Sequence, residues 1–448
     1  MNQLKKHYWE MNIRKIKKII VVKSHKNIGG KMKKVIKLAL SLLLVSVLAT
    51  SNFANGLSLN SVGTRALGMG GAFIARSNDA TAIYWNPAGL AGQQSSVNLF
   101  FTGVMPLGTY KWAPGQIDTK TNSNIYPTGG LMGVYNSGKL TFGLGVFVPA
   151  GLGAEWPGAD LAAFAGGKTF DWESRIGVVA ISPSIAYKIN DKFSIGLSAN
   201  IYYAMFDLSR PNLADLNQDG TPETPVQYKE SSTGLGYGIT LGLKYNITEQ
   251  LTAAATFRTA TKVAMDGTAD ISVQGMGNIL SSGFTRDVTW PMWIGGGFAY
   301  KVNKCLTLAL DAQYSNWANL DKLVADYDKL PEGEFKLNWQ DAVQIRLGGE
   351  YKVSPKAALR LGYYYDPAPA PDETLNILFP SSTNHVVTAG FGYSFGKYSI
   401  DAAAEYLLGG DREITAFPAN VTPDKWENMP GTHHLDVFSF SLGLNFEL

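Results

Sequence analysis

Apolar and polar side chains alternate along most of the chain beyond about residue 95, which predicts strands with two different environments on their two faces. In residues 438–448 every second residue is apolar, and the residues between are small or polar. Fourteen such segments are predicted, near 95–104, 128–135, 140–148, 175–189, 193–208, 231–245, 251–263, 285–300, 305–316, 340–351, 357–365, 385–395, 398–408 and 435–448.

The connections between these segments alternate between short turns, such as 136–139 and 190–192, and long stretches, such as 209–230 and 317–339. An even number of ~10-residue strands with short turns at one end and long loops at the other is typical of bacterial outer-membrane barrels. A soluble sandwich would divide so many strands between domains. We therefore expect an all-β fold, a fourteen-stranded antiparallel transmembrane β-barrel in the outer membrane, with both mature ends on the periplasmic side.

Composition and charge limit the kinds of partner that we expect for this protein. The 448 residues include one Cys, which excludes a disulfide framework and makes a Cys-rich metal centre untenable, so we expect no metal and no cofactor. Residues 1–54 hold 12 Lys/Arg and one acid, whereas residues 55–448 hold 27 Lys/Arg and 35 Asp/Glu, a net charge of −8. The basic excess lies in a segment that we expect to be removed, so nucleic acid is not an expected partner.

That segment is typical of a secretory signal. Lys33, Lys34 and Lys37 precede an apolar stretch, 38–49, that is too short to span a bilayer as a helix. We predict a signal peptide over 32–54, with Met32 as the true start and 1–31 as a start-site artefact or a disordered extension. The mature chain then divides into 55–94 and a barrel over 95–448.

Residues 55–94 do not alternate, and their Ala-rich stretches, interrupted by Gly and by Asn-Pro, predict short helices and turns. Leaving side chains such as Phe73 and Trp85 in water costs ~25 cal/mol per Å². A barrel of this width would otherwise have an interior gap. We expect this segment to fold into the lumen as a hatch.

The chain resembles the FadL-type outer-membrane transporters of long-chain fatty acids and other hydrophobic compounds, which include aromatic-hydrocarbon uptake proteins. The resemblance rests on the start 55–60, the Gly-rich stretch 66–72, the Asn78-Asp79-Ala80 step and, above all, Asn86-Pro87-Ala88-Gly89-Leu90, and it extends over the mature chain in strand count and loop order.

The resemblance implies a hatch that plugs the barrel, a ligand taken from outside, and sideways release through a wall opening at a kinked third strand. It places Asn86, Pro87 and Ala88 in the hatch motif. It places Asn55, Gly56, Leu57 and Leu59 in a moving N-terminal strip. The alternative for Asn86-Pro87 is a plain turn that leads into the first strand. The implied partners are a fatty acid or an aromatic hydrocarbon and the outer-membrane lipids, and we expect a monomer.

The third predicted strand alternates from Leu140 to Phe147 and then reaches Pro149. Proline cannot donate to a strand ladder, and nearby glycines weaken it, so pairing should break near residue 149. We expect an exit to the bilayer flanked by Gly145, Pro149 and Gly151, beneath an apolar loop, 156–167, where cargo first lands. The alternative is that Pro149 only marks the end of the strand.

A fatty acid would need a cation inside the lumen, and Arg346 or Arg360 are the candidates, with Arg210 as a weaker third. An aromatic hydrocarbon would need none. Two other functions remain open. An outer-membrane lipid hydrolase would have to use His385, His433 or His434, the three histidines of the mature chain, although no Gly-x-Ser-x-Gly motif is present. A general diffusion porin would require an open lumen.

Overall fold

The computed structural model describes residues 56–59, 61–217, 219–415 and 426–448. The predicted signal peptide at 32–54, residues 1–31 and the candidate Asn55 lie outside the described residues. In the part of the chain that is described, no helix is long and apolar enough to cross a membrane.

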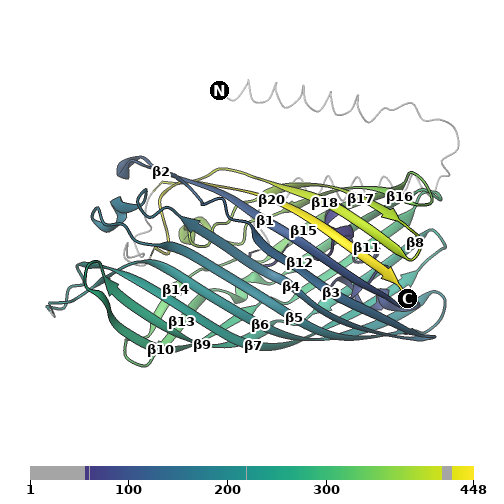
Figure 1. Ribbon diagram of the computed structural model, residues 1–448, viewed down its shortest axis with the longest axis horizontal. Helices are drawn as coiled ribbons and strands as arrows, with labels where there is room; N and C mark the ends of the chain where they lie inside the picture. Colours follow the sequence, from purple (N-terminus) through teal and green to yellow (C-terminus); the bar gives the residue numbers. More distant parts are fainter. Residues whose placement is uncertain (1–55, 60, 218, 416–425) are drawn as a thin grey trace, which may run out of the picture. The chain divides into compact units, whose positions relative to one another are not determined.

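Fourteen antiparallel strands form a closed barrel, which confirms the predicted fold class (Figure 1). The barrel closes between its first and last strands, because β1 (Ser96–Trp112) pairs with β20 (Gly431–Glu447) along their length. Two wall strands each consist of two segments, namely β8 (Leu251–Arg258) with β9 (Thr261–Val273) and β10 (Gly277–Trp290) with β11 (Trp293–Lys301). The segments match because β8 pairs with β11 and β9 pairs with β10.

The other wall elements are β3 (Tyr126–Ser137), β4 (Leu140–Trp156), β5 (Trp172–Lys188), β6 (Phe193–Ala214), β7 (Thr224–Asn246), β12 (Leu306–Ser315), β15 (Ala342–Lys352), β16 (Ala357–Asp366), β17 (Asn384–Ser394) and β18 (Tyr398–Gly409). The long loops contain β2 (Ile117–Lys120), β13 (Lys322–Tyr327), β14 (Gly333–Lys336), β19 (Arg412–Ile414), η2 (Ala113–Gly115), η3 (Ala162–Ala165), η4 (Trp317–Asn319) and η5 (Asp372–Thr374).

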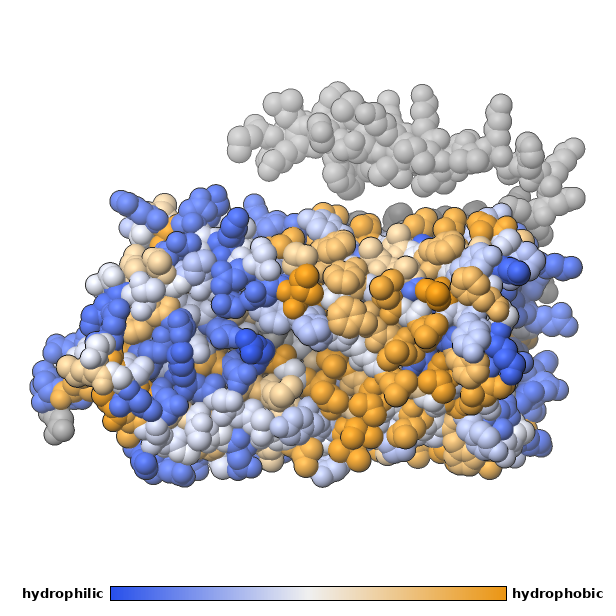
Figure 2. Space-filling model, in the orientation of Figure 1, coloured by the Kyte–Doolittle hydropathy of each residue, from blue (hydrophilic) through white to orange (hydrophobic). Residues whose placement is uncertain are grey.

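The apolar face of the alternating pattern points outward near the short-turn end. Large exposed apolar side chains there include Leu99, Phe101, Leu131 and Phe142. Figure 2 shows hydrophobic residues gathered over the strands toward this end, with hydrophilic residues at its rim and over the long-loop end. This apolar belt is the surface that a bilayer covers.

The alternation predicts a loop over 264–284, and this prediction is wrong: β9 and β10 form a hairpin there. The pattern is inverted in β9, where Val263 and Met265 are buried while Lys262 and Asp266 are exposed. This part of the wall extends beyond the apolar belt, so polar residues face outward and apolar ones pack inside.

The described residues before β1 fold into the lumen as a hatch, near the end of the barrel that carries the C-terminus (Figure 1). The hatch contains α3 (Thr64–Gly68), α4 (Ala82–Trp85) and η1 (Pro87–Leu90). Its apolar side chains are removed from water: Phe73 is 0% exposed and Trp85 1%. Their burial against the wall confirms the predicted hatch.

Candidate functional site

The third wall strand, β4, continues through Pro149 to Trp156, so Pro149 does not end the strand, but its pairing is irregular where the sequence predicts a break. Its register with β5 shifts between Phe147, opposite Ala180, and Ala150, opposite Val178. Two residues, Val148 and Pro149, therefore stand opposite the single residue between, which is a β-bulge. On its other edge, β4 pairs with β3 only from Leu140 to Phe147. Beyond Phe147 the wall has no ladder between β3 and β4.

The N-terminal strip, Leu57–Leu59, occupies the freed edge of β4 from inside the barrel. The Leu59 backbone N–H donates to the Pro149 carbonyl at 3.1 Å, and the Gly151 N–H donates to the Leu57 carbonyl at 2.9 Å. Ser58 forms the bridge partner of Ala150. The sequence-predicted Leu57, Leu59, Pro149 and Gly151 therefore meet in one place, whereas Gly145 lies below the gap and pairs with Met132.

A cavity of 320 Å³, here called the wall cavity, adjoins this gap. Its lining includes Tyr126 and Pro127 of β3 on one side and Ala150 and Gly153 of β4 on the other. The Tyr126 ring covers Gly153 so closely that a Cβ added to Gly153 would lie 2.2 Å from Tyr Cζ. The Tyr126 ring thus fills the space between β3 and β4 that a continuous ladder between the two strands would otherwise close.

The wall cavity reaches both faces of the barrel wall. Among its lining residues, Ile176 is buried in the lumen, whereas the neighbouring Arg175 is exposed. Gly56 and Leu59 of the hatch segment line it from within. The cavity is therefore lined by residues of both wall faces at the position of the gap.

A second, smaller space of 40 Å³, here called the side pocket, lies behind the N-terminal strip. Ser58 and Ala150 line both spaces, so the strip separates them. The side pocket adds Arg258 and Trp290, and the indole N–H of Trp290 is buried without a hydrogen-bond partner. A buried donor without a partner is costly, so this pocket suits a ligand atom that accepts hydrogen bonds.

Arg258 is held by the hatch and the wall. Its guanidinium donates to the Tyr84 carbonyl at 2.7 Å and to the Thr240 hydroxyl at 3.2 Å. It also stacks over the rings of Tyr84 and Trp293, 4.3 and 4.7 Å from their centres. Arg258 was not among the cations predicted for a ligand carboxylate, because strand alternation indicates that its side chain faces the lumen but not which groups it contacts there.

The cations predicted for a ligand carboxylate have other partners. Arg346 donates to the Gly70 carbonyl at 3.0 Å and to Gln344 at 2.7 Å, so it holds the hatch. Arg360 is paired with Glu350 and Asp401. Neither residue lines the wall cavity or the side pocket. Arg210 likewise lies outside both and stacks over Tyr228.

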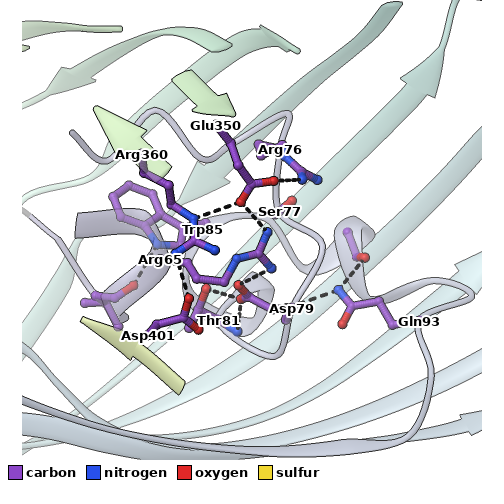
Figure 3. A network of polar contacts seen from close by, with 12 residues as sticks. Arg65, Arg76, Ser77, Asp79, Thr81, Trp85, Gln93, Glu350, Arg360 and Asp401 are labelled. Carbon is purple, nitrogen blue, oxygen red and sulfur yellow. Dashed lines mark hydrogen bonds and ion pairs between the residues drawn. The ribbon is translucent and has the colours of Figure 1, made fainter. Parts of the chain in front are cut away.

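Glu350 is the centre of an ion cluster that clamps the hatch to the wall (Figure 3). Its carboxylate accepts from Arg65 at 3.1 Å and from Arg76 at 2.7 Å, both of the hatch, and from Arg360 of β16 at 2.8 Å. Asp79 and Asp401 complete the cluster, at 3.1 Å from Arg65 and 2.6 Å from Arg360. Three cations and three carboxylates thus hold the hatch at the short-turn end.

The Asn86-Pro87-Ala88 motif fixes the hatch to the opposite wall and does more than turn the chain. The Asn86 amide donates to the carbonyls of Leu243 at 3.1 Å and Ile74 at 3.3 Å, and its oxygen accepts the Ala88 N–H. Gly242 of β7 makes room for it, since an added Cβ would lie 2.1 Å from the Asn86 oxygen.

We expect Gly242→Val to displace the hatch motif, because the new side chain must occupy the volume of the Asn86 amide. Overpacking of this kind costs ~1–3 kcal/mol. Hydrogen–deuterium exchange over 82–90 should rise markedly, while the barrel strands remain protected. The control is Gly133→Val, at a strand position with no atom within 4 Å of the added Cβ. Equal exchange in both variants would contradict this role of the glycine.

The three histidines have partners of their own. His385 bonds to the Tyr363 hydroxyl at 2.8 Å, His433 to the Met429 carbonyl at 2.7 Å, and His434 pairs with Asp411 at 2.7 Å.

A closed fourteen-stranded barrel with an apolar belt, a lumenal hatch and a cavity beside a gap in its strand pairing defines an outer-membrane transport barrel. The chain matches the family described as "Outer membrane protein transport protein (OMPP1/FadL/TodX)" over residues 45–448, and it belongs to that family. The family consists of transport proteins, not enzymes.

Relatives support this assignment at low identity. The chain is 24% identical over 415 residues to a long-chain fatty acid transport protein of Escherichia coli O6:H1, covering 83% of this chain and 91% of that protein. It is 23% identical to outer membrane protein P1 of Haemophilus influenzae, covering 69% and 72%.

Solved structures share the fold. A FadL homologue of Pseudomonas aeruginosa superposes with a TM-score of 0.73 at 18% identity, covering 88% of this chain and 99% of that one. The toluene transporter TodX of Pseudomonas putida gives a TM-score of 0.71 at 18% identity, covering the same shares.

Proposed function

We propose that the protein takes up hydrophobic molecules, foremost long-chain fatty acids, and passes them through the wall into the outer membrane. The observation that carries this proposal is the wall cavity, which adjoins a gap in the β3–β4 ladder and is lined by residues of both wall faces. An apolar cargo that leaves sideways stays beside lipid and never crosses water. The similar proteins include a long-chain fatty acid transport protein and a toluene transporter, which agrees with this cargo class.

Uptake begins at the loop 156–167 at the long-loop end. Phe164 of this loop stacks on Trp112 with ring centres 4.9 Å apart, and its ring meets Trp426 at 5.1 Å. Trp172 joins the cluster. Trp172 and Trp426 are buried, whereas Phe164 and Trp112 are partly exposed. These two rings receive an apolar chain before it descends to the wall cavity.

The two spaces beside the N-terminal strip match the two ends of a fatty acid. Asp366 and Glu405, both buried, line the wall cavity, whereas its lining cation Arg175 is exposed and pairs with Glu173. A carboxylate head is therefore disfavoured beside the two buried carboxylates, while an apolar tail is not. The side pocket provides the opposite environment, with the Arg258 guanidinium and the free Trp290 N–H. When the strip moves, the tail occupies the wall cavity and the head reaches Arg258.

We expect Arg258→Met to weaken fatty acid binding by ~10- to 150-fold, because a hydrogen bond to a charged group contributes about 1.5–3 kcal/mol. Binding of a neutral hydrocarbon of equal length should be unchanged, and Arg258→Lys should restore part of the loss. Equilibrium binding of labelled oleate to the purified protein measures this effect.

Aromatic-hydrocarbon uptake by the same route is the second candidate, favoured by the toluene transporters among the structural neighbours. This candidate predicts that Arg258→Met leaves the binding affinities for oleate and for the neutral hydrocarbon unchanged. It also predicts that toluene binds more tightly than oleate. A general diffusion porin is disfavoured, because the buried hatch fills the lumen.

A further inference from the structure

Apart from the wall cavity and the side pocket, a polar cavity opens beside the hatch at the short-turn, periplasmic end. It has a volume of 280 Å³ and lies among the ends of β5, β6, β7 and β11 and the hatch residues Ala75–Asn78. We call it the basic cup. Its charged lining residues are five cations and one carboxylate, namely Arg76, Lys188, Lys192, Lys244, Lys301 and Asp191.

Only two of these cations have a carboxylate partner. Arg76 pairs with Glu350 at 2.7 Å, and Lys188 pairs with Asp191 at 2.8 Å. Among the described residues, no carboxylate lies within 4.0 Å of Lys192, Lys244 or Lys301. These three lysines converge on one cavity without a counter-ion.

Lys244 is the most buried of the three lysines, since Lys192 and Lys301 are exposed. Its ammonium donates to the Ser77 carbonyl at 3.2 Å, while Arg76 and Lys301 lie near enough to repel its charge. Like charges in a partly dry site destabilise one another unless an anion joins them.

A cavity on the other side of the hatch shows that the excess of cations over carboxylates in the basic cup is local. That space of 360 Å³, the mixed-charge cavity, also lies at the periplasmic end and shares Arg76 and Asn78 with the cup. Its cations are matched almost one for one by carboxylates, namely Arg65, Arg76, Lys352, Lys356 and Arg360 against Asp79, Glu350, Asp401 and Glu447. Of these two cavities, the cup therefore carries the larger excess of positive charge.

The neutral lining of the cup adds further donors. Amides of Asn78, Asn190 and Gln250 and the hydroxyl of Thr307 border the same space. Ammonium groups donate only, so the complementary ligand is an acceptor-rich anion, and phosphate offers several oxygens to several donors at once.

We propose that the basic cup binds a phosphate group. The group is either free inorganic phosphate or the headgroup phosphate of an anionic phospholipid, which can reach the exposed Lys192 and Lys301 at the rim. The site lies at the opposite end from the loop 156–167 and does not depend on the cargo route proposed above.

The test uses the purified full-length mature protein and two probes. Titration calorimetry measures binding of inorganic phosphate in detergent, and native mass spectrometry measures retention of phosphatidylglycerol against phosphatidylcholine from mixed nanodiscs. The variant pair is Lys244→Met with Lys301→Met, and the control pair is Lys352→Met with Lys356→Met in the mixed-charge cavity. A second pair, Lys192→Met with Lys301→Met, leaves the Lys244 bond to the hatch intact.

We expect at least a tenfold loss of phosphate affinity in both cup pairs and none in the control pair. Retention of phosphatidylglycerol without phosphate binding, lost in the cup pairs only, identifies the lipid as the source. Absence of binding for both probes, or equal losses in cup and control pairs, overturns the proposal.

Discussion

Deletion of Pro149 is expected to reduce uptake of oleate by cells at least tenfold while leaving a folded barrel. The bulge in β4 arises because Val148 and Pro149 stand opposite one residue of β5. Deleting Pro149 restores the regular alternation of β4 and removes the residue that lacks a backbone N–H. Pairing with β3 can then continue past Phe147, which closes the gap beside the wall cavity.

The control is Pro149→Ala, which keeps the extra residue and therefore the bulge. It should retain most of the uptake. Heat-dependent mobility on gels monitors folding in both variants. Undiminished transport by the deletion variant, with the register of β4 shown to be regular, would rule out the lateral route.

Glu350→Gln is expected to loosen the hatch and give the barrel a steady ion conductance in planar bilayers. The substitution leaves Arg65, Arg76 and Arg360 around a neutral amide, in a cluster where the Glu350 side chain is 4% exposed. Removing one partner of a buried ion cluster costs about 3–5 kcal/mol, because the remaining charges stay buried. The barrel ladder itself does not depend on this side chain, so the strands should remain assembled.

Glu334→Gln serves as the matched control. Glu334 pairs with Lys322 at 2.9 Å in an exposed loop hairpin, where an ion pair contributes ~0–1 kcal/mol. Low conductance in both variants would show that the clamp is dispensable for keeping the lumen plugged.

The candidate site was predictable only in part. Pro149 indicates a break by its own chemistry, and the structure has the register shift beside it. Gly145 was not distinguishable in the same way, because a glycine in a strand is compatible with normal pairing, as with Met132 here. For Arg346 and Arg360, strand parity gives the direction of the side chain but not the neighbour that meets it.

The sequence by itself determined the number of wall strands, the outward apolar face of the strand parts within the apolar belt and the existence of a hatch, because strand parity and turn chemistry act between residues close along the chain. It did not determine the hairpin of β9 and β10 beyond that belt. The tertiary structure decided where the β3–β4 ladder stops, that Leu57–Leu59 occupies the open edge, and that Arg258 and not Arg346 borders the side pocket. These features depend on contacts between residues far apart in the sequence, such as Ser58 with Ala150 and Arg65 with Glu350. No local pattern in the sequence specifies which distant residue contacts a given side chain in the folded structure.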